Sequence, residues 1–254
     1  MKVVCENIDR LITTELRLPS LVRGTTHQLY NAARKRSELP LTYQIAKDIL
    51  QAQKKVTPNK LKVGIFTGVW HPEHLPDGEN DGPIGAVVLA RALHLMDIEV
   101  TIAIEKEVVP VTKELCRQLD FSVDIVSLSR ENEDENVALS NQLDVAVFIE
   151  KIGPSAEGIY HFATGFARDQ QDAPLGSMLD KMNEANKLTI GIGDMGNEIG
   201  FGKIYEDVRK INPFGEKCKC PERDGLATVL STKHILPVGV SNIGAYGLVA
   251  ALAL

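Results

Sequence analysis

Short apolar runs alternate with stretches of helical period along most of this 254-residue chain. Among these runs, the one at 144–149 is apolar on both faces, as the central strands of parallel sheets are. These runs lie at 61–67, 99–104, 123–128, 144–149, 188–192 and 235–240. Helices are predicted at 82–96, 111–119, 135–142, 178–185, 203–211 and 245–254. The alternation predicts an α/β fold, with a mostly parallel, Rossmann-like sheet and helices on both faces.

Residues 1–58 follow the helical period and precede the first predicted strand. One apolar stripe includes Ile8 and is expected to end at Pro19, because proline cannot continue a helix. Two more helices are predicted, at 25–36 and 41–54. We therefore expect an N-terminal helical lead-in packed on the sheet. No repeat or linker divides the sequence, so we expect a single domain over residues 1–254.

The composition argues against several classes of protein. Hydrophobic residues make up 44% of the chain and charged residues 24%, as in ordinary globular proteins. With a net charge of −6, the chain has no excess of basic residues that would attract nucleic acid or an anionic membrane. The apolar runs are too short to span a bilayer, and the first residues lack the apolar region of a secretory signal. We expect a cytoplasmic protein that binds neither nucleic acid nor membranes.

The four cysteines do not form a disulfide framework in a chain of this length. Cys5 and Cys116 lie in helical patterns and are expected to be buried thiols. Cys218 and Cys220 are two residues apart and could bind a metal, form a redox pair or have only a structural role. No second pair at zinc-ligand spacing follows them, and His234 is the nearest imidazole in the sequence.

Polar loops follow three of the predicted strands. Residues 77–85 and 193–202 combine glycines with acids, and 241–244 precede the last helix. In parallel sheets, ligands bind beyond the carboxyl ends of the strands. Asp81 is expected to cap the helix that begins near Gly82, while Ser241 or Asn242 would cap the last helix. Helix starts attract carboxylate or phosphate groups, so the three loops together predict one polar binding site.

Acidic residues are unusually frequent in these loops. Glu79, Asp81, Asp194, Glu198 and the strand-end residue Glu150 would repel one another if they lay together. A divalent cation, a ligand ammonium or a shared proton would relieve that repulsion. Helix starts and clustered acids together suit a zwitterion such as an amino acid. The alternative for any single loop is a purely local role, as a helix cap or an Asx turn.

Histidines and one lysine are further candidates. His71 and His74 lie in the loop before Gly78 and could close over the site, and His161 is a third imidazole. Each could be a metal ligand or an acid/base group, or simply an exposed loop residue. Lys151 follows the 144–149 strand and could bind a carboxylate or be solvated.

The sequence resembles the D-glutamate cyclase family, and five motifs in the family's order carry the resemblance. They are T-G-V at 67–69, E-N-D-G-P-I-G-A at 79–86, I-E-K-I-G-P at 149–154, G-D-M-G-N-E-I-G-F-G at 193–202 and V-S-N-I-G at 240–244. The resemblance implies a hydro-lyase that dehydrates D-glutamate to 5-oxo-D-proline.

The resemblance also suggests roles for the loop residues. Asp194 and Glu198 would be acid/base or metal groups, and Glu79 and Asp81 would bind the ammonium or a metal. The residues expected to bind substrate are Gly82, Gly85, Glu150, Gly196, Asn197, Ser241 and Asn242. The backbone N–H groups of 82–85 would hold carboxylates. A divalent cation, Mg²⁺ or Mn²⁺, is the candidate cofactor. The candidate partners are a small acidic amino acid and a second copy of the chain in a homo-oligomer.

The motifs depart from the family pattern at several positions. Met195 replaces a glycine, Asn80 a threonine and Ile243 a tryptophan, while 151–154 lacks two family arginines. Loss of those arginines changes how a substrate carboxylate is held and therefore bears on the identity of the substrate. Two alternatives follow: a non-catalytic binder of an acidic metabolite or nucleotide, and a metal-dependent hydrolase that uses the same acids.

Overall fold

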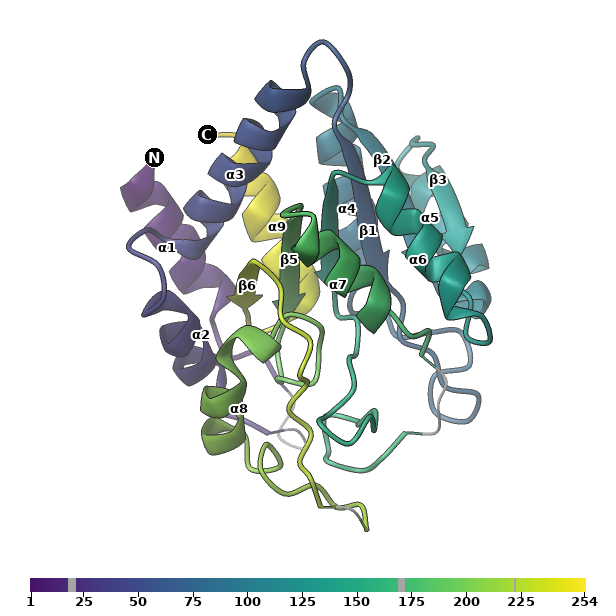
Figure 1. Ribbon diagram of the computed structural model, residues 1–254. Helices are drawn as coiled ribbons and strands as arrows, with labels where there is room; N and C mark the ends of the chain where they lie inside the picture. The colour runs from purple at the N-terminus through teal and green to yellow at the C-terminus, as the bar shows by residue number, and fades with distance from the viewer. Residues whose placement is uncertain (18–21, 169–171, 222) are drawn as a thin grey trace.

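A six-stranded parallel sheet forms the centre of the computed structural model, which describes residues 1–17, 22–168, 172–221 and 223–254 (Figure 1). The strands are β1 (Lys62–Thr67), β2 (Glu99–Ile104), β3 (Asp124–Ser127), β4 (Val145–Ile149), β5 (Leu188–Gly193) and β6 (His234–Pro237). Their order, β3-β2-β1-β4-β5-β6, is the doubly wound order with its switch point between β1 and β4. The predicted Rossmann-like sheet is confirmed.

Strand β4 shows why the apolar runs form a central sheet. All five of its residues are buried, and it is hydrogen-bonded to β1 on one side and to β5 on the other. Val145, Val147 and Ile149 enter one hydrophobic core, while Ala146 and Phe148 enter the other. Side chains alternate across a strand, so a run that is apolar throughout supplies both cores at once.

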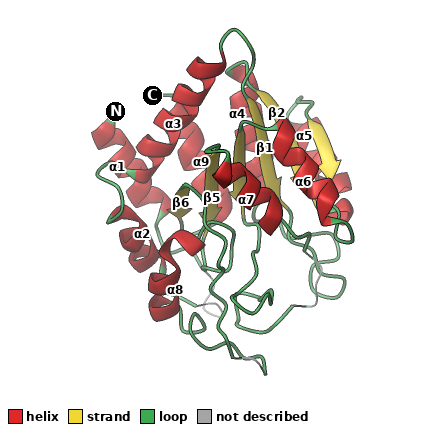
Figure 2. Ribbon diagram, in the orientation of Figure 1, coloured by secondary structure: helices red, strands yellow, loops and turns green. Residues whose placement is uncertain are grey.

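Helices cover both faces of the sheet (Figure 2). The larger core lies under α1 (Lys2–Ile12), α3 (Leu41–Val56), α4 (Pro83–Leu95), α5 (Val109–Gln118) and α9 (Ser241–Leu252). The opposite core lies under α6 (Glu133–Gln142) and α7 (Gly176–Glu184). The remaining helical elements are α2 (Thr26–Arg34), α8 (Tyr205–Ile211) and two 3₁₀ turns, η1 (Lys106–Val108) and η2 (Gly202–Ile204). The expected helical lead-in is therefore present as α1, α2 and α3.

Some predicted boundaries differ from the structure. The first helix ends at Ile12, where the Thr13 hydroxyl donates to the carbonyl of Asp9 at 2.8 Å; Pro19, its predicted end, lies outside the described residues. The last strand ends at Pro237, three residues before its predicted end at 240. The last helix begins at Ser241, four residues before its predicted start, because its first turn is capped by a side chain from elsewhere in the chain.

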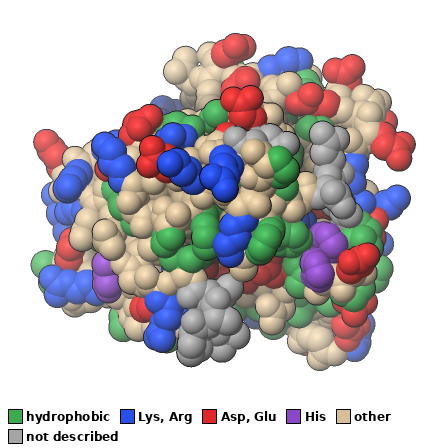
Figure 3. Space-filling model, turned by 90° about the horizontal axis from the view of Figure 1, so that it is seen from below, with side chains coloured by type: hydrophobic (Ala, Val, Ile, Leu, Met, Phe, Trp, Pro, Cys, Tyr) green, Lys and Arg blue, Asp and Glu red, His purple; other side chains and the backbone are tan. Residues whose placement is uncertain are grey.

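The carboxyl ends of the strands all point to the same edge of the sheet, at the bottom of Figure 1, where long loops gather. Figure 3 looks onto this edge from below: hydrophobic and basic side chains mix in the middle, and the acidic ones that show lie mostly toward the rim. Across the described residues, no helix has the length and apolarity that crossing a membrane requires.

Candidate active site

The first turns of α4 and α9 exchange their capping groups. The Asn242 Oδ1 atom accepts from the amides of Gly82 at 3.0 Å and Gly85 at 2.7 Å. In return, the Asp81 carboxylate accepts from the amides of Ser241 at 3.0 Å and Asn242 at 2.7 Å. The expected caps are therefore present but act between helices. The N–H groups of Gly82 and Gly85, which sequence assigned to a substrate carboxylate, are bonded within the protein.

Glycine is required where α4 begins. Gly82 has a φ of +99°, which side chains rarely adopt, and a Cβ there would lie 2.4 Å from the Thr67 hydroxyl. At Gly85 a Cβ would come within 2.9 Å of the Ala245 Cβ on α9. The two helix starts can approach this closely only because both positions lack a side chain.

Three acids meet at the carboxyl ends of β1, β4 and β5. Asp81, Glu150 and Asp194 each place a carboxylate oxygen within 4.8 Å of the other two. Burial is the main cause that raises the pKa of all three, and the charge of Glu198 raises it in each of them. Asp194 and Asp81 also raise the pKa of Glu150, and Asp81 raises that of Asp194. The structure therefore gathers three of the five acids expected from the sequence.

Glu150 is held in an unusual conformation beside this cluster. It follows β4 with a φ of +48°, and the Ser241 hydroxyl donates to its Oε2 atom at 2.5 Å. A non-glycine residue in the left-handed region costs conformational energy, and such residues concentrate at functional sites. Ser241 therefore contacts the acid cluster through its side chain and does not cap its own helix.

Arg17 is a site residue that the sequence analysis did not select. Its side chain is buried, its Nε atom lies 3.5 Å from Asp194 Oδ2, and its Nη2 atom donates to the Asp194 carbonyl. A further bond from Nη1 to the Thr25 hydroxyl, at 3.0 Å, fixes the guanidinium. The lead-in therefore contributes a cation that opposes the rise in the pKa of Asp194.

Glu198 stabilises its own loop. Its carboxylate accepts from the amides of Asp194 at 3.3 Å, Met195 at 3.0 Å and Gly196 at 2.7 Å. Asn197 is also tied to the protein, since its side-chain amide donates to the His161 carbonyl at 2.9 Å. These bonds shape the 193–202 loop, whereas sequence had placed Glu198 among the acid/base and metal groups.

Glu79 lies between an acid and a cation. Burial and the charge of Asp81 raise its pKa to about 7, and Arg168 acts in the opposite direction. The buried Arg168 guanidinium donates to Asp172 at 3.0 Å and to the Trp70 carbonyl at 2.9 Å. Its Nη1 atom is buried with no hydrogen-bond partner among the residues that the structure describes. Arg168 is the second cation that the sequence analysis missed.

Three other candidates, Lys151, His71 and His74, contact neighbouring parts of the protein. Lys151 is fully buried and pairs with the equally buried Glu105 at 2.5 Å, so it is neither solvated nor placed to bind a ligand carboxylate. His71 stacks on His74 with ring centroids 4.6 Å apart, and its Nδ1 atom accepts from two amides of its own turn. These contacts shape the loop after β1.

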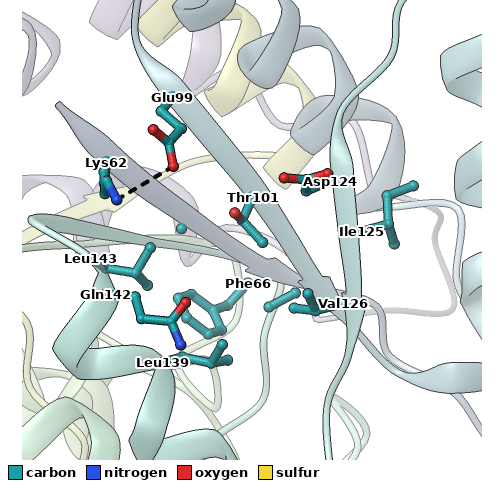
Figure 4. Close-up of a pocket in the computed structure, with 12 residues that line it drawn as sticks. Lys62, Phe66, Glu99, Thr101, Asp124, Ile125, Val126, Leu139, Gln142 and Leu143 are labelled. Atoms are coloured by element: carbon teal, nitrogen blue, oxygen red, sulfur yellow. Dashed lines mark ion pairs between the residues drawn. The ribbon is translucent and has the colours of Figure 1, made fainter. Parts of the chain in front are cut away.

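A cavity of about 290 Å³ lies at the opposite edge of the sheet (Figure 4). Its lining includes the first residues of three strands, Lys62, Glu99 and Asp124, together with Phe66 and Leu139. None of the candidate acids lines it. The cavity is therefore distinct from the cluster at the carboxyl ends, where ligands of parallel sheets bind.

Comparison with known proteins points to one family. The family model described as D-glutamate cyclase-like, C-terminal matches residues 12–254. Human mitochondrial D-glutamate cyclase is 27% identical over 197 residues, which cover 72% of this chain and 31% of the human protein. The aligned part of this chain thus spans less than one third of the length of that relative.

Solved structures show only weak likeness. A variant of actinorhodin polyketide ketoreductase with NADPH is 16% identical, with 56% of this chain and 55% of that chain covered, at a TM-score of 0.32. A short-chain dehydrogenase/reductase from Serratia marcescens is 12% identical, with 55% and 58% covered, at a TM-score of 0.31. Neither score supports an inference about function.

Proposed function

This chain belongs to the D-glutamate cyclase-like, C-terminal family, and we propose that it is a hydro-lyase that converts D-glutamate to 5-oxo-D-proline and water. The observation that carries the proposal is the meeting of Asp81, Glu150 and Asp194 at the carboxyl ends of three strands. The family motifs supply all three residues. The human relative, named D-glutamate cyclase, supports the same reaction.

The charges of the site suit a zwitterionic substrate. Buried acids that lie within 4.8 Å of one another attract a cation, and the substrate ammonium is one. The substrate carboxylates need a different partner, because the helix-start amides at Gly82 and Gly85 are already bonded to Asn242. We assign one carboxylate to Arg168, whose buried Nη1 atom finds no partner in the described parts of the chain. Arg168 would then supply the positive charge that the 151–154 motif lacks.

The reaction moves two protons from the substrate nitrogen to the leaving oxygen. The ammonium must lose one proton before its nitrogen attacks the γ-carboxyl carbon and a second one after the attack, and the γ-carboxylate oxygen must take up two protons to leave as water when its C–O bond breaks. We assign the first transfer to Asp194, whose raised pKa suits it to accept a proton. Glu79, with a pKa of about 7, is protonated in about half of the molecules at neutral pH, and that form can donate a proton to the leaving oxygen. Folding the substrate so that its ends meet lowers the barrier further.

A divalent cation also fits the acid cluster. Mg²⁺ and Mn²⁺ prefer carboxylate oxygens, and Asp81, Glu150 and Asp194 present three of them together. Glu198, a metal candidate from sequence, fits less well because its carboxylate is bonded to loop amides. Bound there, the ion would act as a Lewis acid toward the γ-carboxyl group.

The proposal is tested by NMR of the purified protein with D-glutamate, with L-glutamate as the stereochemical control. Appearance of 5-oxoproline from the D-isomer alone supports the proposal. Saturable binding without turnover would favour the non-catalytic binder. Loss of activity on chelation, with recovery in Mg²⁺ or Mn²⁺, would assign the cation. Hydrolysis of a phosphorylated or amide substrate without cyclisation would favour the metal-dependent hydrolase instead.

A matched pair of variants tests the residue assignment. Asp194→Asn keeps the shape of the side chain but cannot accept the proton, and we expect the rate to fall about 100-fold or more. Asp180→Asn, at an exposed position on α7, is the control and should keep full activity. A folded Asp194→Asn protein with normal turnover would exclude Asp194 as the base.

A further inference from the structure

A second cluster of metal-ligating side chains lies outside the acid site. His161, Cys218, Cys220 and Asp224 each offer one donor atom, and these atoms all lie within 4.8 Å of one another. The imidazole and both sulfur-bearing side chains are buried, and the Asp224 side chain is only 9% exposed. Two sulfurs, one imidazole and one carboxylate form a donor set typical of zinc.

The distances within the cluster match tetrahedral coordination. His161 Nε2 lies 3.4 Å from Cys220 Sγ and 3.8 Å from Asp224 Oδ1, and Cys218 Sγ lies 3.8 Å from the same oxygen. With ordinary zinc–ligand bond lengths, the ligand atoms of a tetrahedron are separated by about 3.3–3.8 Å. These three donor pairs are therefore spaced as the corners of a zinc site, whereas the two sulfurs are bonded to each other and would have to separate.

Cys218 and Cys220 are paired as a disulfide in the structure, with a sequence separation of two. A crosslink over so short a loop restrains the unfolded chain much less than one over a long loop. A metal ion would instead join this segment to His161, which is more than fifty residues earlier in the chain. We propose that the dithiol form of this chain binds one Zn²⁺ through His161, Cys218, Cys220 and Asp224, as a structural site.

A thiol reductant first reduces the Cys218–Cys220 disulfide to two thiols by two electrons and two protons, and zinc binding then releases the two thiol protons to solvent. A hydrogen bond to one of the ligands also suits a structural zinc site. The second oxygen of Asp224 accepts from the amide of Glu157 at 3.2 Å, which orients the carboxylate. The sequence had suggested His234 as the nearest imidazole, but His234 contacts Asp48 at 2.7 Å at the start of β6.

The proposed zinc site lies next to the loop that carries Asp194. The His161 carbonyl accepts from the side chain of Asn197, and the Lys219 amide donates to the Gly165 carbonyl at 2.7 Å. One ion would therefore fasten two irregular loops to each other, and the Asn197 hydrogen bond links them to the 193–202 loop. Irregular loops bury little apolar surface, so a metal crosslink supplies stability that packing does not.

The test uses the full chain, purified in a reductant and without chelating resin. We expect elemental analysis to find about one zinc per chain. Replacement of zinc by Co²⁺ should give the thiolate-to-cobalt charge-transfer absorption, which the all-oxygen acid cluster cannot produce. The Cys218→Ser/Cys220→Ser double variant should lose both signals. The control, Cys5→Ser/Cys116→Ser, removes the other two buried thiols and should keep them.

Native mass spectrometry of the unsubstituted protein keeps the proposal falsifiable if the double variant does not fold. A mass increase of one zinc ion less the displaced protons supports the site. Reduced, folded protein that contains no zinc and gives no cobalt–thiolate absorption would overturn it. The proposal would also be overturned if the Cys218→Ser/Cys220→Ser variant still bound one zinc per chain, because the ion would then lie elsewhere.

Discussion

Glu79→Gln tests whether the loop after β1 holds a protonated acid. Burial and the neighbouring charge of Asp81 raise the pKa of Glu79 from 4.5 to about 7. Between these two values the folded chain binds a proton that the unfolded chain has already lost. The contribution of this group to stability is therefore complete below pH 4.5 and is lost as the pH rises through 7. Glutamine does not ionise, so the stability of the variant should not fall in this way as the pH rises.

The magnitude follows from the two pKa values. Each unit of pKa difference corresponds to about 1.4 kcal/mol, so a shift from 4.5 to about 7 gives an upper limit of about 3 kcal/mol. About 2 kcal/mol of this falls between pH 5.5 and pH 8.5. Over that interval the wild-type chain should lose about 2 kcal/mol of stability relative to Glu79→Gln.

Urea denaturation of both proteins across this pH range measures the difference. Glu73→Gln is the control, because it removes a carboxylate at an exposed position of the same loop. If the difference in unfolding free energy between wild type and Glu79→Gln stays constant across this pH range, within about 0.5 kcal/mol, the argument that burial keeps Glu79 protonated is refuted. A slope of opposite sign would mean that Arg168 dominates instead.

Three substitutions probe the surrounding structure by urea denaturation. Asn242→Ala removes the acceptor of two α4 amides and should cost about 1–2 kcal/mol; no loss would contradict the exchange of caps. Gly82→Ala meets a neighbouring side chain at positive φ and should cost about 1–3 kcal/mol more than Gly158→Ala, which has positive φ but open space; equal effects would exclude the steric cause. Lys151→Met removes one of two cations from the buried Glu105, which keeps its ion pair with Arg130 at 2.9 Å, and should cost about 1–3 kcal/mol; a loss below about 0.5 kcal/mol would show that the Lys151–Glu105 pair is dispensable.

The sequence predicts the sheet well because its strands are buried on both faces. The apolar run of β4 is readable without any knowledge of its neighbours, and so are the other central strands. Boundaries set by distant groups are less predictable. The start of α9 depends on the Asp81 carboxylate, which comes from the loop before α4, so the pattern around 241–245 places the helix start too late.

The candidate site also contains some residues that the sequence predicts and others that it does not. Asp81, Glu150 and Asp194 could be predicted because each follows a strand, and the carboxyl ends of parallel strands share one edge. Arg17 and Arg168 could not, since each is a single basic residue outside any periodic segment. Arg17 reaches a residue 177 positions away, and no local pattern encodes such a contact.

The exchange of caps between α4 and α9 has a consequence for the order of folding. Neither helix supplies its own side-chain cap, and the groups that cap them are about 160 positions apart in the chain. The first turns of both helices are therefore completed only after a long loop has closed, which is a slow and late event. We expect changes at Asn242 to accelerate unfolding while leaving the folding rate almost unchanged. The acids at β1 and β4 would then come together in the last step of folding, and the first step of unfolding would separate them.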